Sequence, residues 1–330
     1  MVHPGRAGGA GVTVVVPVFG SSSTLPDLVR RIHGALGGRE HEVVLVDDGS
    51  VGPTWSTVGA LALSDPSVRG LRLGRNAGQH AALLAGIRAA RFDVVVTLDD
   101  DLQNPPEEIP RLLAALDAKD VDLVYGFRGV QAGPRWRRAA GDLARWTVGR
   151  LAGLDLQHLS PFRAFRTRLR DGAEAAIGPR VVLDAVLQWG TDRVGHVDVE
   201  HHARQDGRSG YGIRRLVAFA LDMMTGYSTR PLRATTWLGF TSALFGMGVL
   251  TFVVGRYFLV DGSSVPGFPF LAATIALFAG AQLVALGVIG EYLARMHVRL
   301  LGQPTYVIAE TVGGEAEGPA ARAGVPDPVE

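Results

Sequence analysis

The segment VVVTLDDDLQNPPEEIP, Val94–Pro110, joins a β-branched run to three consecutive aspartates and then to a proline-led helical pattern. The run is typical of a short buried strand, and Pro105-Pro106 is typical of the start of a helix. The aspartates follow the strand directly, and ligands of parallel α/β sheets bind at the carboxyl ends of strands. The segment therefore predicts an α/β domain with an acidic site at one edge of its sheet.

Alternating strand-like and helix-like patterns extend from Val12 to about Gly126 around this segment. Such alternation predicts a mostly parallel sheet with helices on both faces. The predicted strands are 11–18, 42–48, 68–73, 93–100 and 121–126, and the predicted helices include 24–36, 77–90 and 105–118. Polar clusters at 47–50, 99–101 and 126–128 follow three of the strands and are expected at the same edge.

Several function classes lack their sequence signatures. The first strand is followed by Phe19-Gly20-Ser21 rather than by G-x-G-x-x-G, and no G-K-[ST] occurs in the chain. The absence of Cys excludes thiolate chemistry and Cys-based metal sites. The balance of 33 basic and 32 acidic residues gives no support for binding nucleic acid. The phosphates of a bound nucleotide would need another partner, for which a carboxylate-held metal is the obvious candidate.

The three aspartates have the composition of a divalent cation site. Side chains alternate along an extended chain, so Asp99 and Asp101 share one side and Asp100 takes the other. With the carboxamide of Gln103 they form an oxygen-rich set that suits Mg²⁺ or Mn²⁺. A solvated acidic turn before the next helix is the alternative interpretation.

Two long stretches near the C-terminus contain no charged residue. They cover 22 residues (234–255) and 29 residues (262–290), and about 20 apolar residues suffice to span a bilayer as a helix. Arginines precede the first stretch and follow the second, which favours cytoplasmic outer ends. We expect a multi-pass protein of the cytoplasmic (inner) membrane with a cytosolic N-terminal domain. A pair of buried core helices is the alternative.

Motifs spread from Val12 to Val307 extend these inferences. They are VVVPVF, VLVDDGS, LGRNAGQHAALLAGI, LDDDLQNPPE, VYGFR, FRAF, HHARQDGRSGY, STRPLR and GEY. In this order they resemble glycosyltransferase family 2, in the branch that acts on polyprenyl phosphate. The resemblance implies a GT-A-like fold and inverting transfer of a sugar from a nucleotide-sugar to an undecaprenyl-type phosphate. It also implies a divalent cation, Mg²⁺ or Mn²⁺, and allows a homo-oligomer.

The resemblance assigns roles to individual residues of this chain. The nucleotide-sugar would contact Pro17, Phe19, Asp47, Asp48, Ser50, Arg75, Asn76 and Asp100. The metal would be held by Asp99, Asp101 and Gln103, and the acceptor phosphate by Arg128, Arg138, Arg163, Arg204 and Ser209. Catalysis would rest on Asp99, Asp101, Arg128, Arg138 and Arg204. Structural roles are the alternatives for Asp48, Asn76 and Arg163, and Gly20, Asp142 and Gly210 depart from family usage.

The patterns also divide the chain into segments. The predicted division is a flexible N-terminus (1–11), a catalytic domain (12–210), an interfacial helix (211–232), two membrane spans within 233–295 (about 234–256 and 268–290), a short cytosolic segment (296–312) and a disordered tail (313–330). A second basic amphipathic stretch, 134–151, is expected at the membrane surface. For the helix that begins at residue 211, packing against the sheet of the catalytic domain is the alternative. A polysaccharide synthase and a non-catalytic scaffold or flippase partner with a decayed transferase domain are the alternative functions.

Overall fold

The chain folds into two compact units. A computed structural model describes residues 11–118, 120–127, 149–150, 159–170, 182–200, 230–259 and 267–314. The first unit is an α/β domain that contains all the described strands, and the second contains two long helices.

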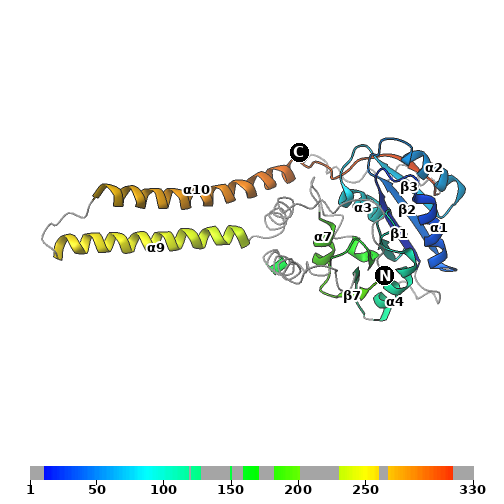
Figure 1. Ribbon diagram of the computed structural model, residues 1–330, viewed down its shortest axis with the longest axis horizontal. Coiled ribbons are helices and arrows are strands. Elements are labelled where there is room, and N and C mark those ends of the chain that lie inside the picture. The colour runs from blue at the N-terminus through cyan, green and yellow to red at the C-terminus, as the bar shows by residue number, and fades with distance from the viewer. Residues whose placement is uncertain are drawn as a thin grey trace, which may run out of the picture. The chain divides into compact units, whose positions relative to one another are not determined.

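The α/β unit is built on an eight-stranded, mostly parallel sheet (Figure 1). The strand order is β7-β5-β6-β4-β1-β2-β3-β8, in which β6 and β8 run antiparallel to their neighbours. The bounds are β1 (Val12–Val18), β2 (His41–Asp47), β3 (Val68–Leu73), β4 (Val94–Thr97), β5 (Leu123–Phe127), β6 (Arg163–Arg166), β7 (Val194–Asp198) and β8 (Ile308–Val312). The predicted fold class is confirmed, and each of the five predicted strands is present.

Helices cover both faces of this sheet because alternate strand residues are apolar on both sides. Val14 and Val16 of β1 pack in one core with α1, α2 and α4, whereas Val15 packs in the other with α3 and α7. The helical bounds are α1 (Leu25–Leu36), α2 (Thr54–Ser64), α3 (Gln79–Arg88), η1 (Pro106–Glu108), α4 (Ile109–Ala118), η2 (Thr167–Leu169) and α7 (Leu183–Trp189). Two apolar cores therefore enclose the central strands, and the loops at the carboxyl edge of the sheet continue directly from these buried strands.

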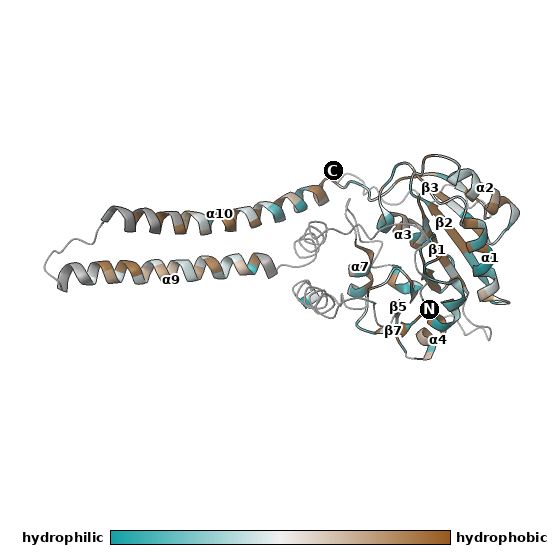
Figure 2. Cartoon of the chain, viewed as in Figure 1, coloured by the Kyte–Doolittle hydropathy of each residue, from teal (hydrophilic) through white to brown (hydrophobic). Residues whose placement is uncertain are grey.

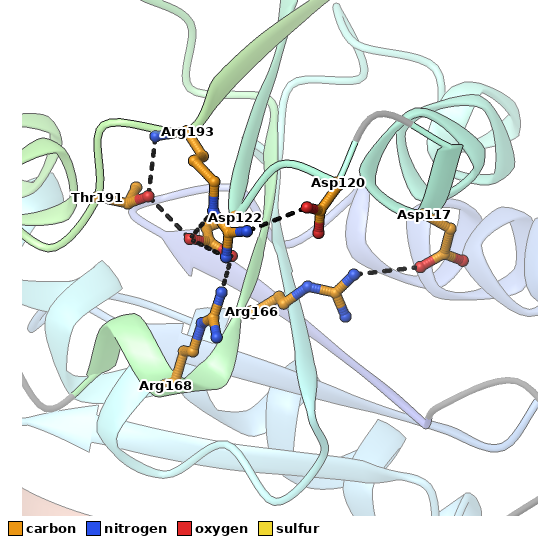
Figure 3. A network of polar contacts seen from close by, with 7 residues as sticks. All are labelled: Asp117, Asp120, Asp122, Arg166, Arg168, Thr191 and Arg193. Atoms are coloured by element: carbon orange, nitrogen blue, oxygen red, sulfur yellow. Dashed lines mark hydrogen bonds and ion pairs between the residues drawn. The ribbon is translucent and has the colours of Figure 1, made fainter. Parts of the chain in front are cut away.

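A cluster of polar side chains connects the amino ends of two strands, at the edge of the sheet opposite to the carboxyl ends (Figure 3). Asp122 precedes β5 and is buried, and it accepts hydrogen bonds from Thr191 Oγ1 at 2.8 Å and from Arg168. Arg193, which precedes β7, donates to the same carboxylate at 3.1 Å. These contacts join the starts of two parallel strands to η2, far along the strands from the predicted site, so we assign the cluster to stability.

The second unit contains two long apolar helices, α9 (Arg230–Leu259) and α10 (Gly267–Leu300), which pack side by side (Figures 1 and 2). Their most apolar windows are Leu232–Val253 and Leu277–Val298, and no part of either window is buried inside the protein. Both helices are long and apolar enough to span a membrane. Buried core helices would be covered by protein, so the exposure of both windows disfavours that alternative.

The chain returns to the α/β unit after α10, which the sequence patterns did not predict. β8 pairs with β3 at the edge of the sheet, and Tyr306 packs against Leu84 and Val186. Arg88 holds the Tyr306 ring by a cation–π contact at 5.5 Å. We name residues 304–312 the C-terminal strap.

Candidate functional site

The loops after β1, β2 and β4 meet at the carboxyl edge of the sheet. The Phe19 N–H donates to Asp100 Oδ2 at 3.4 Å, and the Gly20 N–H donates to Ser50 Oγ at 3.0 Å. The β1 loop is therefore bonded to both neighbouring loops. Residues predicted from three separate motifs lie together, as the parallel topology requires.

Asp47 and Ser50 are buried at this edge of the sheet, and we call the turn that they bound the floor of the site. Asp47 ends β2 with no solvent exposure, and its Oδ1 accepts the Ser50 N–H at 3.1 Å. Ser50 in turn accepts from Gly20, so the turn after β2 is bonded across to the loop after β1. Pro17 is buried within β1, whereas the Phe19 ring is 59% exposed and open to a ligand.

Asp48 bonds the turn after β2 to the loop before α3. Its two carboxylate oxygens accept the backbone N–H groups of Ala77 at 2.7 Å and Gly78 at 2.9 Å. Burial raises the pKa of Asp48, although these two hydrogen bonds act in the opposite direction. Both oxygens are used by the protein, which favours the structural alternative for Asp48.

Gly49 allows that loop to approach closely. Its φ is +67°, and an added Cβ would lie 2.6 Å from the carbonyl carbon of Arg75 and 2.7 Å from the Asn76 nitrogen. A side chain is excluded here by both conformation and space. The exposed side chains of Arg75 and Asn76 are thereby held beside the Asp47–Ser50 turn.

The three aspartates after β4 differ in environment. Gln79, the first residue of α3, donates from Nε2 to Asp99 Oδ1 at 2.6 Å. Burial, reinforced by the charge of Asp101, raises the pKa of Asp99 to about 6, against the opposing effects of Arg163 and Gln79. Burial likewise raises the pKa of Asp100. Asp101 is exposed.

A left-handed residue follows the acidic run. Leu102 has a φ of +57°, which is uncommon for a residue with a branched side chain. The turn brings Gln103 back onto Asp101, whose carboxylate accepts both the backbone N–H, at 3.1 Å, and the side-chain amide of Gln103. Unusual backbone conformations of this kind are concentrated at functional sites.

The chemistry of these side chains fits a hard divalent cation. Burial and, after it, the charge of Asp101 raise the pKa of Asp99, and a bound cation would offset both effects. Among the residues that the structure describes, no three His, Asp or Glu side chains are grouped to hold a metal. Two carboxylates and a carboxamide would leave positions for the oxygens of a substrate.

Arg163 lies inside the protein rather than in an open loop. Its side chain is 2% exposed and forms an ion pair with Asp184 of α7. Asp184 also accepts a hydrogen bond from Tyr125 Oη at 3.1 Å. The guanidinium is used by this buried network, which favours the structural alternative, while its predicted contact with the acceptor phosphate stays a prediction.

Four of the predicted phosphate-binding residues lie outside the described ranges: Arg128, Arg138, Arg204 and Ser209. Their roles stay predictions, as do those of the amphipathic stretches 134–151 and 211–232, which are almost wholly outside those ranges. The structure adds Gln79 and Asp184, which sequence reasoning missed. Gln79 stands within the quoted LGRNAGQHAALLAGI motif, whereas Asp184 has no sequence signal because its partner Arg163 is 21 positions away.

The chain is similar to known proteins over most of its length. Residues 13–175 match the family model described as Glycosyl transferase family 2. The chain is 34% identical over 319 residues to the undecaprenyl-phosphate 4-deoxy-4-formamido-L-arabinose transferase of Pseudomonas fluorescens, covering 94% of this chain and 92% of the relative. The protein of the same name from Pseudomonas aeruginosa is 37% identical over 307 residues, or 91% and 90% of the two chains.

Among solved structures, the chain is similar to glucosyl-3-phosphoglycerate synthase from Mycobacterium tuberculosis, crystallised with Mn²⁺, UDP and phosphoglyceric acid. The TM-score is 0.46 at 21% identity, over 66% of this chain and 77% of the other. The family of the chain is shown by the two Pseudomonas relatives, which are matched over at least nine-tenths of their length, and by the family model. The chain belongs to glycosyltransferase family 2.

Proposed function

We propose that the protein transfers a sugar from a nucleotide-sugar to a polyprenyl phosphate of the undecaprenyl type, with inversion at the anomeric carbon. The observation that carries this proposal is the meeting of the Asp47–Ser50 turn, the Phe19 loop and the Asp99–Asp101 run at one edge of the sheet. The relatives named above, which are matched almost end to end, are undecaprenyl-phosphate sugar transferases.

The donor would occupy this edge. Its base and ribose would lie between the exposed Phe19 ring and the loop of Arg75 and Asn76, above the Asp47–Ser50 floor. Asp99 and Asp101, with Gln103, would hold Mg²⁺ or Mn²⁺ against the diphosphate. When bound, that cation neutralises charge on the leaving nucleoside diphosphate.

The acceptor needs little activation. A phosphate monoester has a second pKa near ~6 and is largely dianionic at neutral pH, so no strong general base is required. The protein would supply orientation and charge, for which the planar, permanently charged guanidinium groups of Arg128, Arg138 and Arg204 are suited.

The C-terminal strap supports an arrangement in which α9 and α10 each cross the membrane once. The start of α9 and the end of α10 would then both lie on the cytosolic side. Only residues 301–307 separate α10 from β8. Seven extended residues reach at most about 25 Å, which is less than the ~30 Å hydrocarbon core. The end of α10 would therefore lie on the same side as the α/β unit.

The natural absence of Cys allows this topology to be tested directly. Single cysteines introduced by Ser263→Cys and Gln303→Cys would be labelled in intact spheroplasts with a membrane-impermeant maleimide. We expect labelling at 263 and none at 303 until the membrane is permeabilised. Equal labelling at both positions in intact spheroplasts would exclude the hairpin.

Transfer itself is tested with purified full-length protein in detergent. A panel of UDP-, GDP- and dTDP-sugars would be incubated with undecaprenyl phosphate, and lipid-linked label would be counted. One donor should give product, which EDTA and Asp101→Ala abolish and which the exposed helix variant Asp27→Ala leaves intact. Absence of product from the whole panel would favour the non-catalytic scaffold, and product that is insensitive to EDTA and to Asp101→Ala would exclude the metal assignment.

A further inference from the structure

The C-terminal strap adds an edge strand that buries little apolar surface. β8 pairs antiparallel with β3 through Gly70↔Val312, Leu71↔Thr311 and Arg72↔Glu310. Its residues 308–311 are exposed, and only Val312 packs against the core. Burial of apolar side chains therefore explains only part of why β8 pairs with the sheet, and polar contacts of this strand must contribute as well.

Glu310 makes the main polar contacts of this strand. Its Oε1 accepts from Arg72 Nη1 at 2.7 Å, and its Oε2 accepts from Trp55 Nε1 at 2.9 Å. The Arg72 guanidinium also lies 5.9 Å from the centre of the Trp55 ring. Hydrogen bonds from Arg72 and then Trp55 hold the pKa of Glu310 below its ordinary value.

Arg72 connects this contact to the floor of the predicted donor pocket. Its Nε lies 3.5 Å from Asp47 Oδ2, at paired positions of β2 and β3. Asp47 is fully buried, and its Oδ2 accepts no hydrogen bond from any described residue. A buried carboxylate oxygen in this state depends on the nearby guanidinium for its charge balance. Asp47 Oδ1 holds the Ser50 turn, so movement of Asp47 would move the turn as well.

We propose that Glu310 is a positioning residue for the donor site: it fixes Arg72 beside Asp47, so that the segment after the second apolar helix completes the floor of the nucleotide pocket. The proposal rests on the proposed function, because the nucleotide contact of Asp47 is part of it. The loss of Glu310 should weaken nucleotide binding more than it slows transfer.

The test uses the full chain in detergent and two readouts. The dissociation constants of UDP, GDP and dTDP are measured by titration calorimetry with Mn²⁺, and the tightest-binding nucleotide becomes the probe. Glu310→Gln should raise its dissociation constant and the donor KM about two- to fivefold, as expected for one partly exposed ion pair, with kcat and the acceptor KM within twofold of wild type. Glu107→Gln is the matched control, because Glu107 forms a similarly exposed two-pronged pair with Arg31 at 2.7 and 2.8 Å.

A double-mutant cycle separates positioning from a merely structural role. If Glu310 acts through Arg72, Glu310→Gln should add nothing to the rise in dissociation constant already caused by Arg72→Gln. A wild-type dissociation constant in Glu310→Gln, or a full additive effect on the Arg72→Gln background, would overturn the positioning role while leaving the proposed function intact. Failure of the wild type to bind any of the three nucleotides would overturn both.

Discussion

Asp99→Asn should stabilise the metal-free protein while it abolishes transfer. Burial and Asp101 raise the pKa of Asp99 from 3.8 to about 6, so the folded state disfavours the ionised carboxylate. A raised carboxyl pKa leaves stability intact below pH 3.8 and removes it progressively as the pH rises to about 6. About two pKa units correspond to up to about 3 kcal/mol of unfolding free energy at neutral pH. The Asn side chain keeps an oxygen for the Gln79 hydrogen bond and carries no charge.

Thermal unfolding followed by Trp fluorescence, in detergent with EDTA, measures this effect. A gain of this size corresponds to a Tm that is higher by about 5 °C or more at pH 8. The two proteins should converge near pH 4, and added Mn²⁺ should raise the Tm of the wild type alone. Asp117→Asn, at an exposed carboxylate, is the control. A lower Tm for Asp99→Asn at pH 8, or a difference that does not change with pH, would refute the reasoning.

Three further changes test the framework of the site. Asp48→Ala leaves the N–H groups of Ala77 and Gly78 without their acceptor and should cost about 1–3 kcal/mol in chemical denaturation, with Asp48→Asn intermediate. Asp184→Ala strands the buried Arg163 charge and should cost about 3–5 kcal/mol, most of which the double change with Arg163→Met should restore. Gly49→Ala should weaken nucleotide binding in titration calorimetry at least tenfold, whereas Gly37→Ala, also at a positive φ but with open space around it, should not.

Local patterns were sufficient to predict the central sheet. β1, β2, β4 and β5 are mainly apolar runs because both of their faces are buried, and such runs are visible without knowledge of the fold. β3 alternates apolar residues with the half-buried Arg69 and Arg72. β6 and β7 are short and contain charged or polar residues, so their sequences do not predict strands. β8 is mostly exposed and owes its conformation to pairing with β3. The paired residues Arg72 and Glu310 are 238 positions apart, and periodicity cannot reveal such a contact.

The candidate site divides in the same way. The residues after β1, β2 and β4 were predictable because parallel topology brings carboxyl ends together, and they are found in contact. The contacts of the predicted residues were not, because they arise through tertiary packing. Gln79 bonds Asp99, and Arg72 lies beside Asp47. Asp184 pairs with Arg163. Motif positions alone were not sufficient for Asp48 and Arg163. Both match the family motifs, but their charged groups contact other parts of the chain.

The chemical form of the lipid product tests the central claim most directly. Product from the active donor and undecaprenyl phosphate would be extracted into organic solvent and analysed by mass spectrometry and phosphorus content. Transfer of the sugar alone to the acceptor phosphate predicts a lipid heavier than undecaprenyl phosphate by one sugar residue, with one phosphorus atom per lipid. Two phosphorus atoms per lipid, or a free sugar with unaltered undecaprenyl phosphate, would contradict the account.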